Sequence, residues 1–366
     1  MRDVIDQVAA WWRDGAAVGV GTVVATERSA PRRAGATMAV GPDGTVVGNV
    51  SGGCVESAVY DLAAGARDTG VPALQRYGVS GDDAVGLTCG GTVDVFVERI
   101  DRLSFPELGA VAEDVAAGRP VAVATLVDGD RSRLGRRLVV WPDSVSGGLG
   151  SARLDDAVRD DARGLLRGGQ SGVLRYGPDG ERLGDDIAIF VAGYAPRPRM
   201  IVFGAIDFAA AVARVGAFLG YRVTVCDARP AFATAARFPD PDEVIVEWPH
   251  RYLARTGVDE RTVVCVLTHD PKFDVPLLEI ALRRPLAYVG AMGSRRTNAD
   301  RLARLRELGL SEDELSRLHA PIGLDVGART PEETAVSIAA EIIATRWGGS
   351  GVQLRAADGP IHQRPL

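Results

Sequence analysis

The first half of the chain carries one sequence pattern twice, and this internal repeat limits what the chain can fold into. The matching segments are, in order, 15–24 and 118–127, 35–43 and 135–143, 74–78 and 173–177, and 93–97 and 187–191. The second copy follows the first after roughly 100 residues throughout, as expected for two similar units packed on one another. We therefore predict an internally duplicated α/β domain over residues 1–192, with halves at about 1–101 and 102–192.

Beyond a segment rich in proline and glycine, the pattern changes to short apolar runs that alternate with helical stretches. The apolar runs lie at 200–204, 221–226, 243–246, 262–268 and 286–290. Short continuous apolar strands separated by helices are typical of a parallel sheet covered on both faces. We predict a linker at 193–199, a Rossmann-like doubly wound parallel-sheet domain at 200–347, and a flexible tail at 348–366. The fold class is therefore α/β.

The composition argues against several classes of protein. Hydrophobic residues make up 46% and charged residues 25% of the chain, as in ordinary soluble proteins, and no apolar run approaches the ~20 residues that span a bilayer. The N-terminus carries acids and lacks the apolar core of a secretory signal, so we expect a cytoplasmic protein. The net charge of -6 gives no reason to expect nucleic acid as a partner. Four cysteines are too few for a disulfide scaffold, which leaves them available for binding or reaction.

Two of the cysteines are flanked by paired glycines. Cys54 follows Gly52 and Gly53 at the start of a predicted helix, and Cys89 precedes two further glycines. Glycine lets a backbone approach a ligand closely. The second copy of the repeat has neither cysteine, which favours a functional site over a structural staple. The alternative is a small buried cysteine at a strand-to-helix corner. No Cys-x2-Cys or histidine pair lies nearby, so we expect no conventional metal site.

The surroundings of Cys54 favour a thiolate that meets an anionic ligand. A helix N-terminus stabilises negative charge, and Arg28, Arg32 and Arg33 would add to this effect if folded close, whereas Glu56 would oppose it. Thiolates suit sulfur exchange or a soft metal, and arginines beside a glycine-rich turn suit a phosphate. We therefore predict a site for an anionic, sulfur-rich cofactor, with Cys54 and Cys89 as candidate functional thiols and no catalytic role assigned. Its candidate binding residues are Arg32, Arg33, Ser51, Gly52, Gly53, Cys54, Glu56, Cys89, Gly90 and Gly91.

The predicted parallel sheet carries an altered dinucleotide fingerprint. Gly204 follows the first strand and Asp227 ends the second, the positions that admit a pyrophosphate and hold a ribose. However, Ile206 replaces the second glycine of the fingerprint and Asp207 would repel a phosphate, which argues against NAD(P). The candidate binding residues of this crevice are Gly204, Asp227, His269, Asp270 and, as an anion cradle, Gly293, Ser294 and Arg295. Tight turns with solvated side chains are the alternative for the later loops.

Several long motifs occur in one order along most of the chain. They are SAPR at 29–32, GATM at 35–38, GNVSGGCVE at 48–56, CGG at 89–91, VFGA at 202–205, RFP at 237–239, LTHD at 267–270, YVGAMGSRR at 288–296 and PIGLDVGARTPEE at 321–333. With these motifs the chain resembles the XdhC/CoxI family of maturation factors for molybdenum hydroxylases such as xanthine dehydrogenase. The resemblance runs from about residue 18 to residue 347. One departure is that the family pattern Gly-Ala-Gly-His after the first Rossmann strand is here Gly204-Ala205-Ile206-Asp207.

The resemblance implies a maturation chaperone with no turnover of its own. It implies transient binding of the molybdenum cofactor (molybdopterin), protection while a cysteine desulfurase installs the terminal sulfur, and transfer to the apo-form of a molybdenum hydroxylase. A contact of Cys54 or Cys89 with the molybdenum fits this role. Two other classes stay open: an NAD(P)-dependent oxidoreductase that uses the C-terminal crevice, and a thiol-based metal or redox sensor. A homodimer is compatible with the sequence, because symmetric assembly is common among soluble proteins.

Overall fold

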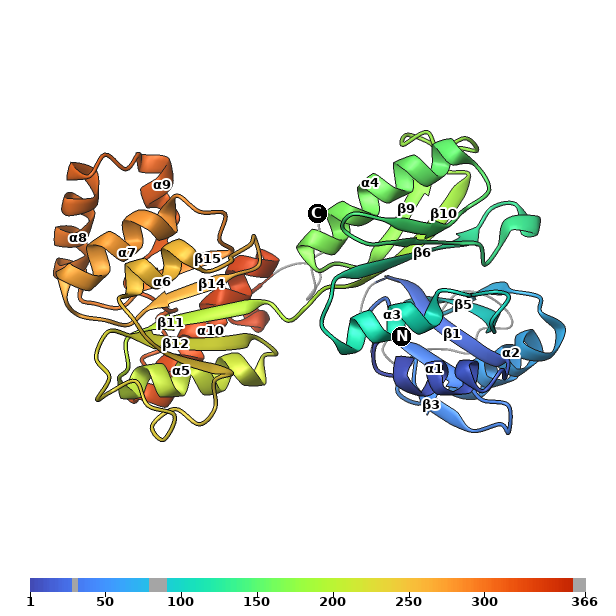
Figure 1. The fold of residues 1–366 in the computed structure, drawn as a ribbon, viewed down its shortest axis with the longest axis horizontal. Coiled ribbons are helices and arrows are strands. Elements are labelled where there is room, and N and C mark those ends of the chain that lie inside the picture. The colour runs from blue at the N-terminus through green and yellow to red at the C-terminus, as the bar shows by residue number, and fades with distance from the viewer. Residues whose placement is uncertain (28–31, 79–90, 358–366) are drawn as a thin grey trace. The chain divides into compact units, whose positions relative to one another are not determined.

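The computed structural model describes residues 1–27, 32–78 and 91–357. Its chain divides into two compact units, Met1–Pro196 and the residues from Arg197 onward (Figure 1). Among the described residues, no helix has both the length and the apolar character needed to cross a membrane.

The first unit contains two antiparallel sheets with the same arrangement. The first half comprises α1 (Ile5–Arg13), β1 (Val18–Glu27), β2 (Thr37–Val40), β3 (Val46–Gly48), α2 (Glu56–Thr69), β4 (Ala73–Tyr77) and β5 (Thr92–Ile100). The second comprises α3 (Leu108–Ala116), β6 (Val121–Asp128), the 3-10 turn η1 (Arg131–Arg133), β7 (Arg137–Val140), β8 (Val145–Gly147), α4 (Ala152–Gly168), β9 (Gly172–Tyr176) and β10 (Ile187–Tyr194). The strand orders are β3-β2-β1-β5-β4 and β8-β7-β6-β10-β9. Each position in the first sheet therefore has its counterpart in the second.

Helix α2 packs directly on β1, and glycine makes this contact possible. A Cβ added to Gly19 would lie 2.0 Å from the carbonyl oxygen of Ala63, and one added to Gly21 would lie 2.7 Å from a methyl group of Val59. Only glycine at these positions lets the helix approach the strand so closely. This packing fixes α2, and hence the loop before its first residue, against the centre of the first sheet.

The two halves share a hydrophobic core. One buried cluster joins Val8 of α1 and Val20 of β1 to Leu108 of α3 and Val121 of β6. A second, smaller cluster joins Phe96 of β5 to Phe190 of β10. Neither half could bury these side chains without the other, so the first unit is a single folding domain built from two repeats.

The second unit is a six-stranded parallel sheet. Its elements are β11 (Arg199–Phe203), α5 (Asp207–Phe218), β12 (Arg222–Asp227), β13 (Glu243–Val246), α6 (Pro249–Arg255), β14 (Val263–Val266), α7 (Pro271–Leu282), β15 (Tyr288–Ala291), α8 (Arg295–Glu307), α9 (Glu312–Ser316), β16 (Leu318–His319), α10 (Pro331–Trp347) and the 3-10 turn η2 (Leu354–Ala356). The strand order is β13-β12-β11-β14-β15-β16, the 3-2-1-4-5-6 order of the dinucleotide-binding fold.

Helices cover both faces of this sheet, as Figure 1 shows. Val202 of β11 packs with α5 and α10 on one face, while its neighbour Phe203 packs with α6 and α7 on the other. Burial on both faces explains why the central strands β11, β14 and β15 are almost continuous apolar runs. The predicted fold class, a duplicated α/β domain followed by a Rossmann-like doubly wound domain, is confirmed.

The connection between the units is shorter than the predicted linker at 193–199. Strand β10 runs to Tyr194 and β11 begins at Arg199, so both ends of that segment belong to strands. Gly193 and Tyr194 pair with Ala122 and Val121 of β6, and such pairing is invisible in a local composition rich in glycine and proline. In the predicted tail, η2 lies beyond α10, and residues 358–366 lie outside the described part of the chain.

Candidate functional site

Cys54 lies in the loop that joins β3 to α2, directly before Val55, the N-cap residue of the helix. Gly52 and Gly53 have φ angles of 82° and 127°, and a Cβ on either would meet nothing within 4 Å. The backbone conformation, not the available space, therefore requires glycine at both positions. Both glycines are exposed, while Cys54 is half-buried against the hydrophobic cluster beneath the loop. The loop thus presents a thiol at the surface of the first half.

The carboxylate of Glu56 fills the ring of backbone amides that this loop forms. The amide nitrogens of Ser51, Gly52 and Gly53 each lie 2.8 Å from a carboxylate oxygen of Glu56. The hydroxyl of Ser51 also donates to it, at 2.6 Å, and accepts from the amides of Cys54 and Val55, each at 3.1 Å. The amides of Ser51, Gly52 and Gly53 were candidates for binding a cofactor, but an internal carboxylate already uses them.

The electrostatics of Glu56 follow from these contacts. Burial opposes ionisation, but the hydrogen bonds from Ser51, Gly53 and Gly52 prevail and lower the pKa of Glu56 to about 2. A carboxylate that accepts several backbone N–H bonds is held in its charged form. Glu56 therefore acts as the internal anion that shapes the loop and positions Cys54, a role that its place in the first turn of α2 suggested only in part.

Of the predicted arginines, Arg32 is tied to the same loop. Its Nε donates to the side-chain oxygen of Asn49 at 2.7 Å, and Asn49 begins the segment that leads to Cys54. Arg33 is exposed. Arg28 lies outside the described residues. One guanidinium group thus stands at the entry to the cysteine loop.

The second predicted thiol, Cys89, lies outside the described residues, as does Gly90. Gly91 is described and lies next to Gly78, because a Cβ on Gly78 would be 3.1 Å from the carbonyl oxygen of Gly91. Tyr77 and Val93, which pair across β4 and β5, belong to the hydrophobic cluster against which Cys54 packs. The strand ends that flank residues 79–90 therefore share one cluster with Cys54.

The second half has a shorter loop at the corresponding place, between Gly147 of β8 and Ala152 of α4, and this loop contains no cysteine. The amide of Leu149 donates to Asp155 of α4 at 2.7 Å, so a carboxylate in the first turn again holds the loop before the helix. Arg133 donates through Nε and Nη2 to the carbonyl oxygen of Leu149, at 2.9 and 2.7 Å. Ser151 is the N-cap of α4, so a carboxylate in the first turn of a helix can hold this shorter loop without a cysteine.

In the second unit, Asp227 is fully engaged by neighbouring groups. It is only 2% exposed, and its carboxylate accepts hydrogen bonds from the amide of Ala205 at 2.7 Å and from Nε and Nη2 of Arg229 at 2.9 and 2.8 Å. Burial opposes ionisation, but these bonds lower the pKa of Asp227. A carboxylate with these partners has little capacity left for a ribose hydroxyl.

Gly204 allows close packing of the turn that follows β11. A Cβ there would lie 3.1 Å from backbone atoms of Leu267 and Thr268, so the glycine lets the end of β11 approach the end of β14. Ile206, the N-cap of α5, makes no side-chain capping bond, and the exposed Asp207 lies 3.5 Å from Arg237. The turn after β11 therefore lacks the second glycine of the dinucleotide fingerprint. The acid of that fingerprint, Asp227, is already paired with Arg229.

Two of the predicted site residues, in the loops after β14 and β15, are N-cap residues of the helices that follow. Asp270 is the N-cap of α7, where it accepts from the amide of Lys272 at 3.1 Å, and His269 beside it is exposed. Ser294 is the N-cap of α8 and accepts from the amide of Thr297 at 3.1 Å. Gly293 and Arg295 flank Ser294, so the three members of the predicted anion cradle lie together.

Sequence reasoning missed a buried ion pair beneath these loops. Arg301 of α8 and Asp274 of α7 are each 3% exposed, and their charged groups lie 2.8 Å apart. Thr268, at the end of β14, donates to the same carboxylate. Arg301 lies three residues before Arg304 in a strongly basic helix, where nothing in the local pattern separates a buried arginine from solvated ones.

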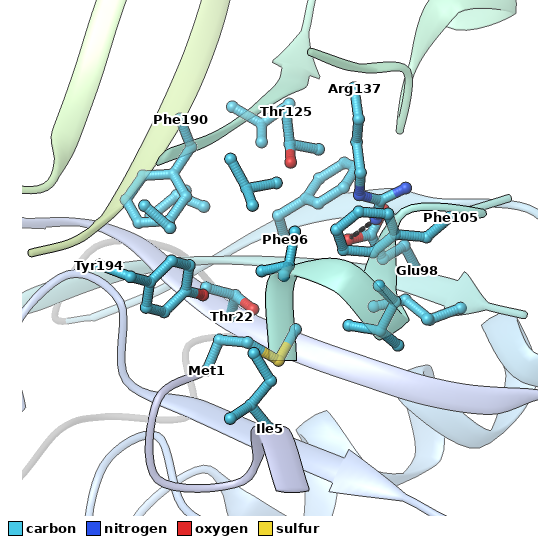
Figure 2. Close-up of a pocket in the computed structure, with 17 residues that line it drawn as sticks. Met1, Ile5, Thr22, Phe96, Glu98, Phe105, Thr125, Arg137, Phe190 and Tyr194 are labelled. Carbon is cyan, nitrogen blue, oxygen red and sulfur yellow. Dashed lines mark ion pairs between the residues drawn. The ribbon is translucent and has the colours of Figure 1, made fainter. Parts of the chain in front are cut away.

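A cavity lies between the two halves of the first unit, away from Cys54 (Figure 2). Its volume is about 40 Å³, enough for a few water molecules but far below the size of a cofactor site. Its wall is apolar apart from a few groups, chiefly the ion pair of Glu98 and Arg137. Burial raises the pKa of Glu98 against the effect of Arg137. The cavity belongs to the interface between the repeats and is not the cofactor site.

Among the described residues, no group of three histidine, cysteine, aspartate or glutamate side chains is placed to hold a metal ion. Cys54 offers a soft sulfur ligand, and Arg32, a residue type that suits a phosphate, is bonded to Asn49 at the start of the same loop.

Both units match known family models. Residues 200–342 match the model described as the XdhC Rossmann domain, and residues 11–78 and 114–177 match that of the XdhC and CoxI family. The two segments of the second match fall in the two halves of the repeat.

Individual relatives cover nearly the whole chain. A Bacillus subtilis protein, named as a probable component of xanthine dehydrogenase, is 30% identical over 89% of this chain and 92% of its own length. The Escherichia coli molybdenum cofactor insertion chaperone PaoD is 29% identical over 89% of this chain and 82% of its own. A crystal structure of a Bacillus halodurans protein described as a xanthine dehydrogenase superposes with a TM-score of 0.67 at 26% identity, covering 93% of this chain and 95% of that one.

Proposed function

Since the chain belongs to the XdhC and CoxI family, we propose that it binds the molybdenum cofactor and assists its sulfuration and insertion into a molybdenum hydroxylase of the xanthine dehydrogenase type. The name of its relative PaoD, a molybdenum cofactor insertion chaperone, supports this role. In this proposal the chain holds the cofactor transiently, receives sulfur through a cysteine desulfurase, and passes the cofactor to the apo-hydroxylase.

The observation that carries the proposal is the asymmetry between the two repeats. Both halves hold a loop before a helix through a carboxylate in its first turn, Glu56 in one and Asp155 in the other. Only the first half has a thiol at this place, that of Cys54, which is half-buried beside the exposed Gly52 and Gly53. The second half holds its shorter loop through a carboxylate without any cysteine, which supports a binding role for Cys54 over an architectural one.

The residues around Cys54 fit part of the cofactor. The half-buried sulfur of Cys54 can approach a molybdenum centre or its terminal sulfur as a soft ligand, and Arg32 is bonded to Asn49 at the start of the loop. The amides of Ser51, Gly52 and Gly53 do not take part, because Glu56 occupies them. The phosphate of the cofactor therefore needs a separate site.

A nicotinamide-dependent reaction in the second unit is the weaker alternative. The carboxylate of Asp227 accepts from Ala205 and Arg229, which leaves it poorly suited to a ribose. Saturable binding of NADH or NADPH by the full chain at micromolar ligand would favour this alternative over the chaperone role.

The binding test uses the full chain loaded with isolated molybdenum cofactor and separated from excess by gel filtration. Molybdenum and pterin retained per chain are then measured for the wild-type protein and for Cys54→Ala and Cys54→Ser. We expect retention to fall by about tenfold or more in both variants, since a metal–thiolate contact is lost. Cys226→Ala removes a buried thiol of the second unit and is the control, with unchanged retention. Equal retention by all four proteins would remove Cys54 from the site.

A further inference from the structure

Helix α8 begins with charges of the wrong sign for its dipole. Its first turn contains no acid and carries Arg295 and Arg296, both exposed. The N-terminus of a helix bears partial positive charge, so cations there are unfavourable unless an anion joins them. By contrast, α10 begins with Glu332 and Glu333. The first turn of α8 therefore lacks a negative charge to offset the helix dipole and the two arginines.

A third arginine lies buried against the same helix end. The side chain of Arg301 runs back toward the start of α8, as helical side chains do, and its Nη2 donates to the carbonyl oxygen of Met292 at 2.9 Å. The same nitrogen lies 3.6 Å from the position that a Cβ on Gly293 would take. The guanidinium thus lies directly under the turn that leads into α8.

The other terminal nitrogen of this guanidinium has no partner. Nη2 of Arg301 is bonded to Asp274 and Met292, but Nη1 is buried without a hydrogen-bond partner among the described residues. A buried, charged donor left unsatisfied is costly. Arg301 is 3% exposed, so solvent does not compensate for the missing bond.

Backbone donors complete the arrangement. Ser294 caps the amide of Thr297, while the amides of Arg295 and Arg296 make no hydrogen bond within the described part of the chain. Gly293 has a φ angle of 150°, which favours glycine, and a Cβ there would lie 3.4 Å from the side chain of Thr297. These two amides belong to the first turn of α8, and the guanidinium of Arg301 lies under the adjoining Gly293.

We propose that the N-terminal end of α8 binds a phosphate group. The amides of Arg295 and Arg296 and their exposed side chains contact its oxygens, and the guanidinium of Arg301, with Nη1 unpartnered among the described residues, lies behind Gly293. Helix N-termini with backbone donors and arginines are suited to this ligand class. The phosphate can belong to a pterin monoester or to a nucleotide, and identifying it with the cofactor rests on the proposed function. The phosphate site itself does not.

The test measures binding of pyrophosphate, ADP and molybdopterin to the full chain by isothermal titration calorimetry. We expect saturable pyrophosphate binding, weakened about tenfold or more by Arg295→Gln/Arg296→Gln, because two charge-assisted contacts are lost. Arg304→Gln/Arg306→Gln removes the same charge from the last turn of α8 and is the matched control, with a change of less than about twofold. Arg301→Lys keeps a charge beside Asp274 but loses the second terminal nitrogen, and we expect weaker binding with an unchanged circular dichroism spectrum.

Two results would overturn the site: no saturable binding of any of the three ligands by the folded wild-type chain, or equal weakening in the first-turn and last-turn double variants. If molybdopterin binds more tightly than ADP, the phosphate is that of the pterin. If ADP binds more tightly, the phosphate is that of a nucleotide. If none of the ligands binds here but the chain still retains cofactor through Cys54, the phosphate site fails while the proposed function stands.

Discussion

At the scale of single residues, Glu56 explains how the cysteine loop is built. A cluster of backbone amides beside two glycines looks in the sequence like a cradle for an anionic ligand, but the chain supplies the anion itself. What the loop offers to a ligand is therefore the thiol and not the amides. The sequence contains Glu56 in plain view, yet the spacing alone does not show that its carboxylate folds back onto the preceding residues.

Replacing Glu56 by glutamine should destabilise the first unit by about 1–3 kcal/mol near neutral pH, because several amides lose a charged acceptor. The folded-state pKa of about 2 lies below the ordinary 4.5, so this stabilisation is fully present above pH 4.5 and disappears as the pH falls toward 2. Urea unfolding of both proteins at pH 7 and pH 3 measures the difference, which should be smaller at pH 3.

The matched control is Asp155→Asn in the second half, where the carboxylate accepts from a single loop amide, that of Leu149. We expect this variant to lose less stability at pH 7 than Glu56→Gln does. A Glu56→Gln variant as stable as the wild type, or a difference that grows as the pH is lowered, would contradict the role given to Glu56.

At the scale of elements, the position of the site depends on the contact between α2 and β1. Gly19→Ala places a Cβ 2.0 Å from the carbonyl oxygen of Ala63, so helix or strand must move, and we expect a loss of about 3 kcal/mol or more. Gly65→Ala in the same helix adds a methyl group in open space and should stabilise the chain by about 0.5–1 kcal/mol. Thermal and urea unfolding check both. Equal effects of the two substitutions would refute this account of the packing.

The elements also show what the sequence could and could not foretell. The apolar runs marked β11 to β15, since strands buried on both faces are largely apolar, but not the two-residue edge strand β16. The repeat predicted two equivalent halves. Local composition misassigned Gly193 and Tyr194 to a linker, because their pairing with β6 is a long-range contact. Local composition also gave no sign that Arg301 is buried or that Arg229 pairs with the carboxylate of Asp227. Partners distant in sequence decide such features.

At the scale of the whole molecule, the two repeats depend on one another. Glu98 and Arg137 come from different halves, are 8% and 7% exposed, and form an ion pair beside the cavity of Figure 2. Arg137→Met leaves Glu98 buried without its partner and should cost about 3–5 kcal/mol, whereas the double change Glu98→Leu/Arg137→Met should recover most of that stability. Urea unfolding of the single and double variants tests this coupling. Additive losses would mean that the pair does not join the halves.

The central claim, that Cys54 takes part in delivering cofactor to a client, is tested most directly by reconstitution. Apo-hydroxylase, molybdenum cofactor and cysteine desulfurase are combined with the wild-type chain, with Cys54→Ala, or with Cys226→Ala, and the hydroxylase activity recovered is measured. The account predicts that the wild type and Cys226→Ala raise the recovered activity well above that without the chain, and that Cys54→Ala gives about a tenth of that increase or less. Full recovery with folded Cys54→Ala, or no increase with the wild type, would contradict it.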